Sequence, residues 1–227
     1  ILWLVPPEPP RQAQTARSAR GSLRAVLAHG PTLRLNFGVF VLHAVMLAMW
    51  VAVPQMLVGA GLAKAHHWWI YLPTIGASFL VMGATLFPME RRGRLRIVYL
   101  GAVALIGLAY LGLAGAAAWQ ARDPGAVGLG LMGLLLFLFF CASNILEASQ
   151  PSIASRAAPP EARGAALGLY NTLQSLGFFA GGAAGGLLLR AAGAPGLFLA
   201  CAGAIALWLI VAWPMNPQAL ARPAGAS

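Results

Sequence analysis

Six apolar stretches, each long enough to cross a lipid bilayer, fill most of the chain and leave little sequence between them. A bilayer-spanning helix needs about 20 mostly apolar residues, because the hydrocarbon core is about 30 Å thick. The six stretches are Leu33–Gly61, Trp68–Pro88, Leu95–Ala118, Val127–Ile153, Ala165–Leu189 and Pro195–Trp213. Lipid is therefore the expected solvent for most of this protein, and we expect a function that needs a membrane.

The composition points to the same class. Hydrophobic residues make up 59% of the 227 residues, charged residues only 9%, and the mean hydropathy is +0.76, whereas a soluble domain is about 25% charged. Backbone polar groups in lipid must be satisfied internally, and these stretches are too long for barrel strands. We expect an all-α integral membrane protein. Its predicted regions are a cytoplasmic linker with a short interfacial helix at 1–32, six transmembrane helices at 33–214 and a cytoplasmic tail at 215–227.

The net charge of +10 is distributed as the positive-inside rule predicts. Of the 15 Lys and Arg residues, the loops on one side of the predicted membrane hold all but Lys64, Arg122 and Arg190. We therefore expect both termini in the cytoplasm, and we expect the basic residues to serve topology rather than nucleic-acid binding.

The order of the spans suggests two groups of three, 33–118 and 127–213, with opposite orientations in the membrane. Inverted three-helix repeats of this kind are used by transporters, and here the prediction rests on topology alone. The chain opens with the apolar residues Ile1–Val5, followed by Pro6 and Pro7. This resembles the end of an earlier helix, so we expect the chain to be the later part of a longer protein.

Enzyme motifs are missing from the sequence. It contains no HExxH, GxSxG, Walker lysine or CxxC pattern, and Cys141 and Cys201 both lie inside apolar stretches. We therefore expect no enzymatic activity, no metal site and no cofactor.

Polar residues inside the spans are costly and are functional candidates for that reason. Glu147 is the only acidic residue inside a span, and Asn144 and Gln150 lie three residues before and after it, which predicts one polar helical face. His43 is the only histidine inside a span, at a similar predicted depth. We expect these four residues to form a proton, cation or substrate site. The alternatives are a structural carboxyl bonded to a neighbouring helix or to loop arginines, and a histidine that only packs in the core.

The fifth apolar stretch carries the clearest pattern of small residues. Glycines spaced by four let helix backbones approach closely, and we expect such packing at Gly177, Gly181 and Gly185. Polar residues on the same stretch, together with one on the first, are expected to line a cavity or an interdomain seam. These are Tyr170, Asn171, Gln174 and Asn36.

Taken together, these residues resemble the second half of a major facilitator superfamily transporter. The segments Asn144–Ser152 and Arg163–Gly177 are similar to helices ten and eleven of bacterial proton-coupled exporters, and Asn36–His43 is similar to helix seven. The resemblance covers nearly the whole chain. It implies half of that fold, with helices seven and ten lining a central cavity and helix eleven packing against a missing N-terminal six-helix half. The turn Glu90–Arg94 is similar to the family's acidic–basic loop signature but lacks its Gly-x-x-x-Asp part.

The function that this resemblance implies is secondary active transport by alternating access. We expect proton-coupled efflux of drug-like or small organic solutes across a bacterial inner membrane. The implied partners are the lipid bilayer, a small-molecule substrate, protons and the missing six-helix half. A proton-coupled importer and a non-transporting membrane scaffold or receptor stay open as alternatives, and this half of the sequence does not identify the substrate.

Overall fold

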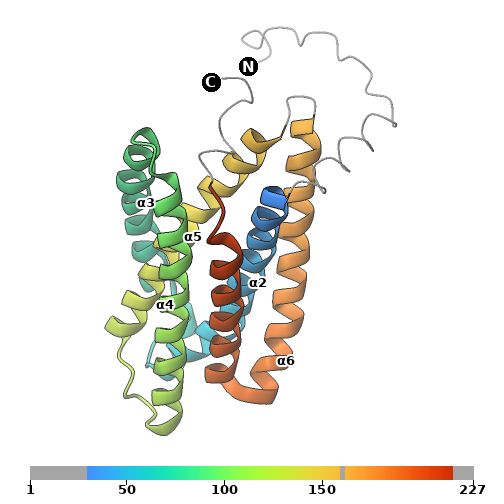
Figure 1. Cartoon of the computed structure of the whole chain (residues 1–227). Coiled ribbons are helices and arrows are strands. Elements are labelled where there is room, and N and C mark those ends of the chain that lie inside the picture. The colour runs from blue at the N-terminus through green and yellow to red at the C-terminus, as the bar shows by residue number, and fades with distance from the viewer. Residues whose placement is uncertain (1–29, 159–161, 217–227) are drawn as a thin grey trace, which may run out of the picture.

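The computed structural model describes residues 30–158 and 162–216, and this part of the chain is helical throughout, without β-strands (Figure 1). Five of its helices are long and apolar enough to cross a membrane. The elements are α2 (Gly30–Gly59), the short 3-10 helix η1 (Lys64–His66), α3 (Trp68–Arg91), α4 (Leu95–Arg122), α5 (Leu129–Ala157) and α6 (Arg163–Ala212). The prediction of an α-helical membrane protein is therefore confirmed. The interfacial helix predicted before residue 30 and the tail after residue 216 lie outside the described residues.

The fifth and sixth predicted spans both fall within α6, which is 50 residues long and bent at Gly193. A straight helix of that length measures about 75 Å, far more than a bilayer is thick. Gly193 has φ 67° and ψ −176°, a conformation that glycine adopts without steric cost. The chain reverses there, so that residues 163–192 and 194–212 run in opposite directions (Figure 1). We call these the first and second arms of α6.

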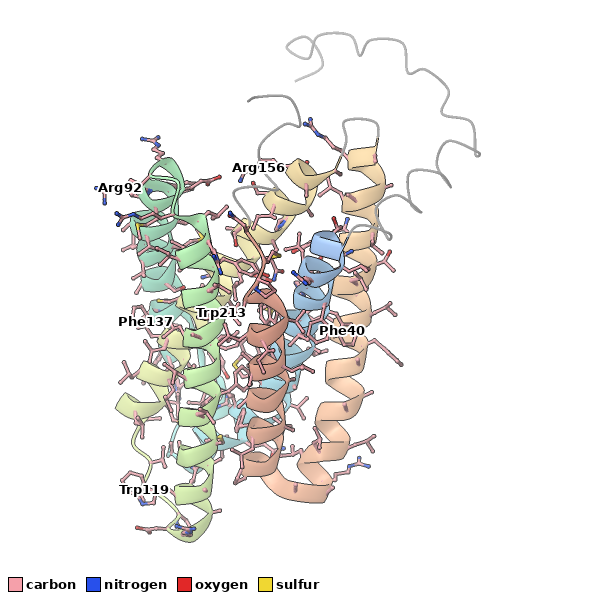
Figure 2. All side chains as sticks on the ribbon, viewed as in Figure 1. Phe40, Arg92, Trp119, Phe137, Arg156 and Trp213 are labelled. Carbon is pink, nitrogen blue, oxygen red and sulfur yellow. The ribbon has the colours of Figure 1, made fainter. Side chains whose placement is uncertain are left out.

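Basic side chains gather at one end of the bundle, where α3 ends and α4 begins. Arg92 and Arg156 lie at this end, which we call the basic end, and Trp119 lies at the other (Figure 2). Arg156 Nη2 donates to Glu90 Oε1 at 2.6 Å and so links α5 to α3. Because both side chains are partly exposed, this ion pair adds little stability.

Tyr110 joins four helical segments in the centre of the bundle. Its ring on α4 packs against Phe139 of α5 and Phe198 of the second arm, with ring centroids 5.9 and 6.0 Å apart. Its hydroxyl donates to the Val45 carbonyl of α2. A buried hydroxyl without a partner would be costly, so this bond allows a fully buried tyrosine to fill the core.

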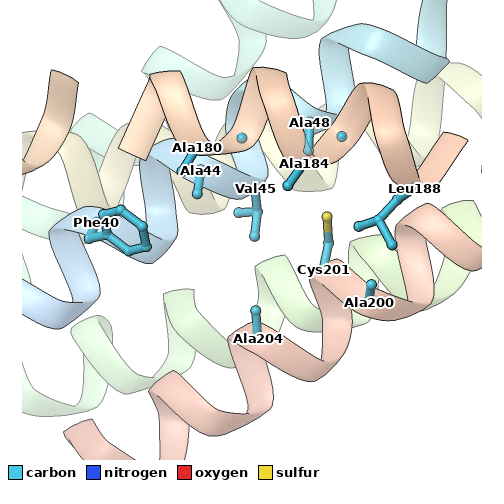
Figure 3. A pocket seen from close by; sticks show the side chains of 12 residues that line it. Phe40, Ala44, Val45, Ala48, Ala180, Ala184, Leu188, Ala200, Cys201 and Ala204 are labelled. Carbon is cyan, nitrogen blue, oxygen red and sulfur yellow. The ribbon is translucent and has the colours of Figure 1, made fainter. Parts of the chain in front are cut away.

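The closest helix contact joins α2 to the first arm of α6. A Cβ atom added at Gly177 would lie 2.6 Å from the Phe40 carbonyl oxygen, and one at Gly181 would overlap the Ala44 backbone. Small residues on both partners permit this approach. Ala44 of α2 and Ala180 of α6 lie in this contact, beside a shallow apolar groove (Figure 3).

This contact leads to a stability prediction. We expect Gly181→Ala to lower the melting temperature in detergent, because the new methyl group must push α2 away at a cost of roughly 1–3 kcal/mol. Gly186→Ala is the matched control, since a Cβ there meets nothing within 4 Å and alanine favours the helix. Equal melting temperatures for the two variants would show that the α2–α6 contact is looser than described.

Candidate functional site

His43 is completely buried on α2, and hydrogen bonds occupy both of its ring nitrogens. Nδ1 donates to the Val39 carbonyl of the preceding turn at 2.7 Å. Nε2 accepts from the Gln174 side-chain amide of α6 at 2.9 Å. An amide nitrogen only donates, so these bonds select the neutral ring with its proton on Nδ1.

Glu147 approaches the same ring from α5. Its Oε1 lies 3.8 Å from His43 Nε2, and its side chain is 35% exposed whereas that of His43 is 0% exposed. Among the described residues it accepts no hydrogen bond of normal length. Pro151, four residues later, has no N–H to donate to the Glu147 main-chain carbonyl. The Glu147 main-chain carbonyl is therefore left without the hydrogen bond that a regular helix would provide.

Two aromatic rings of α6 enclose the imidazole. Phe178 and Tyr170 meet it edge-on, with centroid distances of 5.0 and 6.3 Å and interplanar angles of 83° and 89°. Their apolar surfaces exclude water from His43 and hold the ring in one orientation. We call His43, Glu147, Tyr170, Gln174 and Phe178 the His43 cluster. It combines a titratable base, a carboxyl group and an amide across three helices.

The polar residues on either side of Glu147 point to other neighbours. Asn144 donates to Ser78 Oγ of α3 at 2.7 Å. Gln150 is fully buried next to Tyr99, and neither of its amide atoms makes a hydrogen bond of normal geometry to the part of the chain that the structure describes. Steps of three residues turn a helix by about 300°, so Asn144 and Gln150 point roughly 120° apart. The expectation of one shared face was therefore too simple for this helix.

The four residues predicted to line a cavity or an interdomain seam also lie in different surroundings. Tyr170 and Gln174 belong to the His43 cluster, whereas Asn171 is exposed on the first arm. Asn36 is buried on α2, and within residues 30–158 and 162–216 its Nδ2 has no hydrogen-bond partner. Phe178 was not among the predicted site residues. Its only signal in the sequence is its position four residues after Gln174, on the same helical face.

The comparisons with known proteins point to transport. No family profile matches the chain. The chain is 34% identical over 217 residues to the inner membrane transport protein YajR of Escherichia coli, covering 95% of this chain and 46% of that protein. It is also 27% identical over 171 residues to an uncharacterized transporter of Buchnera aphidicola, covering 75% of this chain and 41% of that protein.

The chain spans about half the length of the curated relatives that it matches. Both relatives are named as transporters rather than as enzymes. Together with the apolar helices, this likeness relates the chain to membrane transport proteins. The general expectation of a membrane transporter is thus supported.

The different surroundings of Gln150 and Asn144 give a testable contrast. We expect Gln150→Met to leave the melting temperature unchanged or to raise it, because an unbonded buried amide costs about 1–3 kcal/mol. We expect Asn144→Leu, which is similar in shape, to lower it, because the bond to Ser78 is lost. A strongly destabilised Gln150→Met variant would indicate that a bound water satisfies the amide and would contradict this prediction.

Proposed function

We propose that the chain is the C-terminal half of a major facilitator superfamily transporter and that the His43 cluster is its proton site. Three observations support this proposal: the likeness to transporters of about twice the length, the residues similar to helices ten and eleven, and a carboxyl–imidazole pair inside the apolar bundle. The pair carries most weight, because ionisable groups are kept within a membrane mainly where they act.

The proposed half-fold contains six spans in two inverted groups of three. The break at Gly193 supports it, because each arm of α6 is long enough to cross the hydrocarbon core by itself. The basic end would face the cytoplasm under the positive-inside rule. Helices of a second half would then cover the exposed polar residues of the first arm, among them Asn171 and Ser175.

Proton binding in this cluster would involve a change of hydrogen-bond partners. In the neutral ring, His43 Nε2 accepts from Gln174. A proton arriving at Nε2 would turn that atom into a donor, which the Gln174 amide nitrogen cannot accept. The amide would have to rotate and offer its oxygen, or the Glu147 carboxylate would have to close the 3.8 Å gap and form a charged hydrogen bond.

This change gives the proton a means to act on the helices. Glu147 is the partly exposed member of the pair and His43 the buried one, so a proton would enter through the carboxyl group. The two residues lie on α5 and α2, and a tighter bond between them would draw these helices together. Alternating access needs such a coupling between an ion and a movement.

The first functional test is Glu147→Gln in the full-length protein, reconstituted in proteoliposomes. We expect substrate transport driven by a pH gradient to fall at least tenfold, because an amide cannot carry the proton while its shape is preserved. Substrate binding measured without a gradient should persist. Asp123→Asn, in the exposed turn after α4, is the matched control and should transport like the wild type.

Proton-driven transport that is unchanged in Glu147→Gln would contradict the proposed proton site. If no transport of any tested solute is found while Glu147→Gln and the wild type fold equally well, the proposal of a transporter fails and a scaffold or receptor role is favoured.

The direction of transport has its own test. For proton-coupled efflux, we expect inside-out membrane vesicles with an acidified lumen to accumulate a fluorescent organic cation, and a protonophore to abolish the accumulation. Accumulation in right-side-out vesicles with an acidic exterior would instead identify a proton-coupled importer.

A further inference from the structure

A second apolar groove runs between α4 and the second arm of α6, and none of its lining residues belongs to the His43 cluster. It has a volume of about 490 Å³, and only Gly, Ala, Val, Ile and Leu line it. Gly107 of α4 and Gly203 of α6 supply space along its length, and Leu108 and Leu199 are exposed at its edges. The two segments lie side by side (Figure 1). In a membrane this groove would open to lipid.

Positive charge and an interfacial aromatic ring lie at the basic end of this groove. Arg96 Nη2 donates to the Trp213 carbonyl at 2.7 Å and so joins the two walls. Arg96 lies seven and eleven residues before Val103 and Gly107, and Trp213 lies four and seven residues after Leu209 and Ala206. These intervals place Arg96 and Trp213 on the same helical stripes as the groove residues. Arg96 and Trp213 therefore lie on the helix faces that line the groove, one to two helical turns beyond its end.

The depth of the groove suits one leaflet of a bilayer. At about 1.5 Å per residue, the α4 wall from Val103 to Leu111 begins roughly 10 Å from Arg96 and ends roughly 22 Å from it. The opposite wall, from Leu209 to Leu199, covers roughly 6 to 21 Å from Trp213. The two walls are therefore roughly 12 and 15 Å long, and the hydrocarbon of one leaflet is about 15 Å thick. An acyl chain that fills the groove would leave roughly 6–10 Å between its upper end and the level of Arg96 and Trp213, where the headgroup would lie.

The charges around this end favour an anionic headgroup. Arg94, immediately before α4, is exposed and has no ion pair among the described residues. The nearby acidic residue in the chain, Glu90, is held by Arg156. The N-terminus of α4 adds free backbone N–H groups and the positive end of the helix dipole. Together with Arg96, these groups suit a phosphate.

We propose that this surface binds one anionic phospholipid, with its phosphate at Arg94 and Arg96 and one acyl chain in the groove between α4 and the second arm. The lipid extends the contact between Arg96 and Trp213 along the full length of the groove. It thereby fixes the second arm to α4 without involving any residue of the His43 cluster.

The test is native mass spectrometry of the full-length protein in detergent. Dioleoyl-phosphatidylglycerol and dioleoyl-phosphatidylcholine are titrated in parallel, because they share acyl chains and differ in headgroup charge. We expect phosphatidylglycerol to bind roughly tenfold more tightly, as two arginines near a phosphate would give. The double variant Arg94→Gln/Arg96→Gln should lose that preference, whereas Arg122→Gln, at the opposite end of the same helix, should keep it.

The groove itself is tested with Gly203→Leu, which fills it, and with Gly101→Leu, which adds the same side chain to an exposed position of α4 outside it. A Cβ at either glycine meets nothing within 4 Å. We expect Gly203→Leu to weaken binding of both lipids at least fivefold and Gly101→Leu to bind like the wild type. If Gly203→Leu does not keep a wild-type elution profile and melting temperature, Ala206→Leu replaces it.

Four results would overturn the proposal. Equal affinities for the two lipids would exclude headgroup recognition. If Arg122→Gln loses the preference as fully as the double variant does, the preference depends on the net charge of the protein and not on Arg94 and Arg96. Wild-type lipid binding by the groove-filling variant would exclude the groove. A protein dimer that Gly203→Leu abolishes would identify a second copy of the chain, not a lipid, as the occupant.

Discussion

The close contact between α2 and the first arm of α6 is the constraint on which the candidate site depends. A Cβ at Gly177 would lie 3.1 Å from the His43 Cβ, so the glycine that brings the backbones together also brings His43 to α6. Tyr170, Gln174 and Phe178 lie within two turns of Gly177 and meet the ring from that side. The close packing at Gly177 therefore also determines where His43 meets the polar and aromatic side chains of α6.

The buried polar groups of the bundle differ in how well they are satisfied. Tyr110 and Asn144 have partners on neighbouring helices and act as cross-links between them. Gln150, Tyr99 and Trp208 lie close together without a hydrogen bond of normal geometry among them. In apolar surroundings a hydrogen bond is stronger, and a polar group without one costs more free energy. Tyr110 and Asn144 therefore stabilise the bundle, whereas Gln150, Tyr99 and Trp208 lower its stability.

Much of the fold could be predicted from the sequence, because apolar length is a local property. The first four predicted stretches correspond to α2, α3, α4 and α5, and α6 bends at Gly193, in the gap between the fifth and sixth predicted stretches. Glu147 and His43 stood out as ionisable residues in apolar surroundings. Their neighbours could not be predicted equally well, because residues three apart on α5 face different helices and the sequence does not say which helix lies where. Ser78, Tyr99 and Phe178 became visible only once the helices were packed.

The bond from His43 Nδ1 to Val39 has a mechanical consequence. Because that partner lies on the same helix, the ring travels with α2 as a rigid part of it. Gln174 and Glu147 belong to other helices, so any sliding of α2 changes their distances to Nε2 while the Nδ1 bond stays intact. Under the proposed function, the protonation state of His43 would therefore depend on where α2 lies relative to α5 and α6, and a proton on Nε2 would in turn favour one placement of α2.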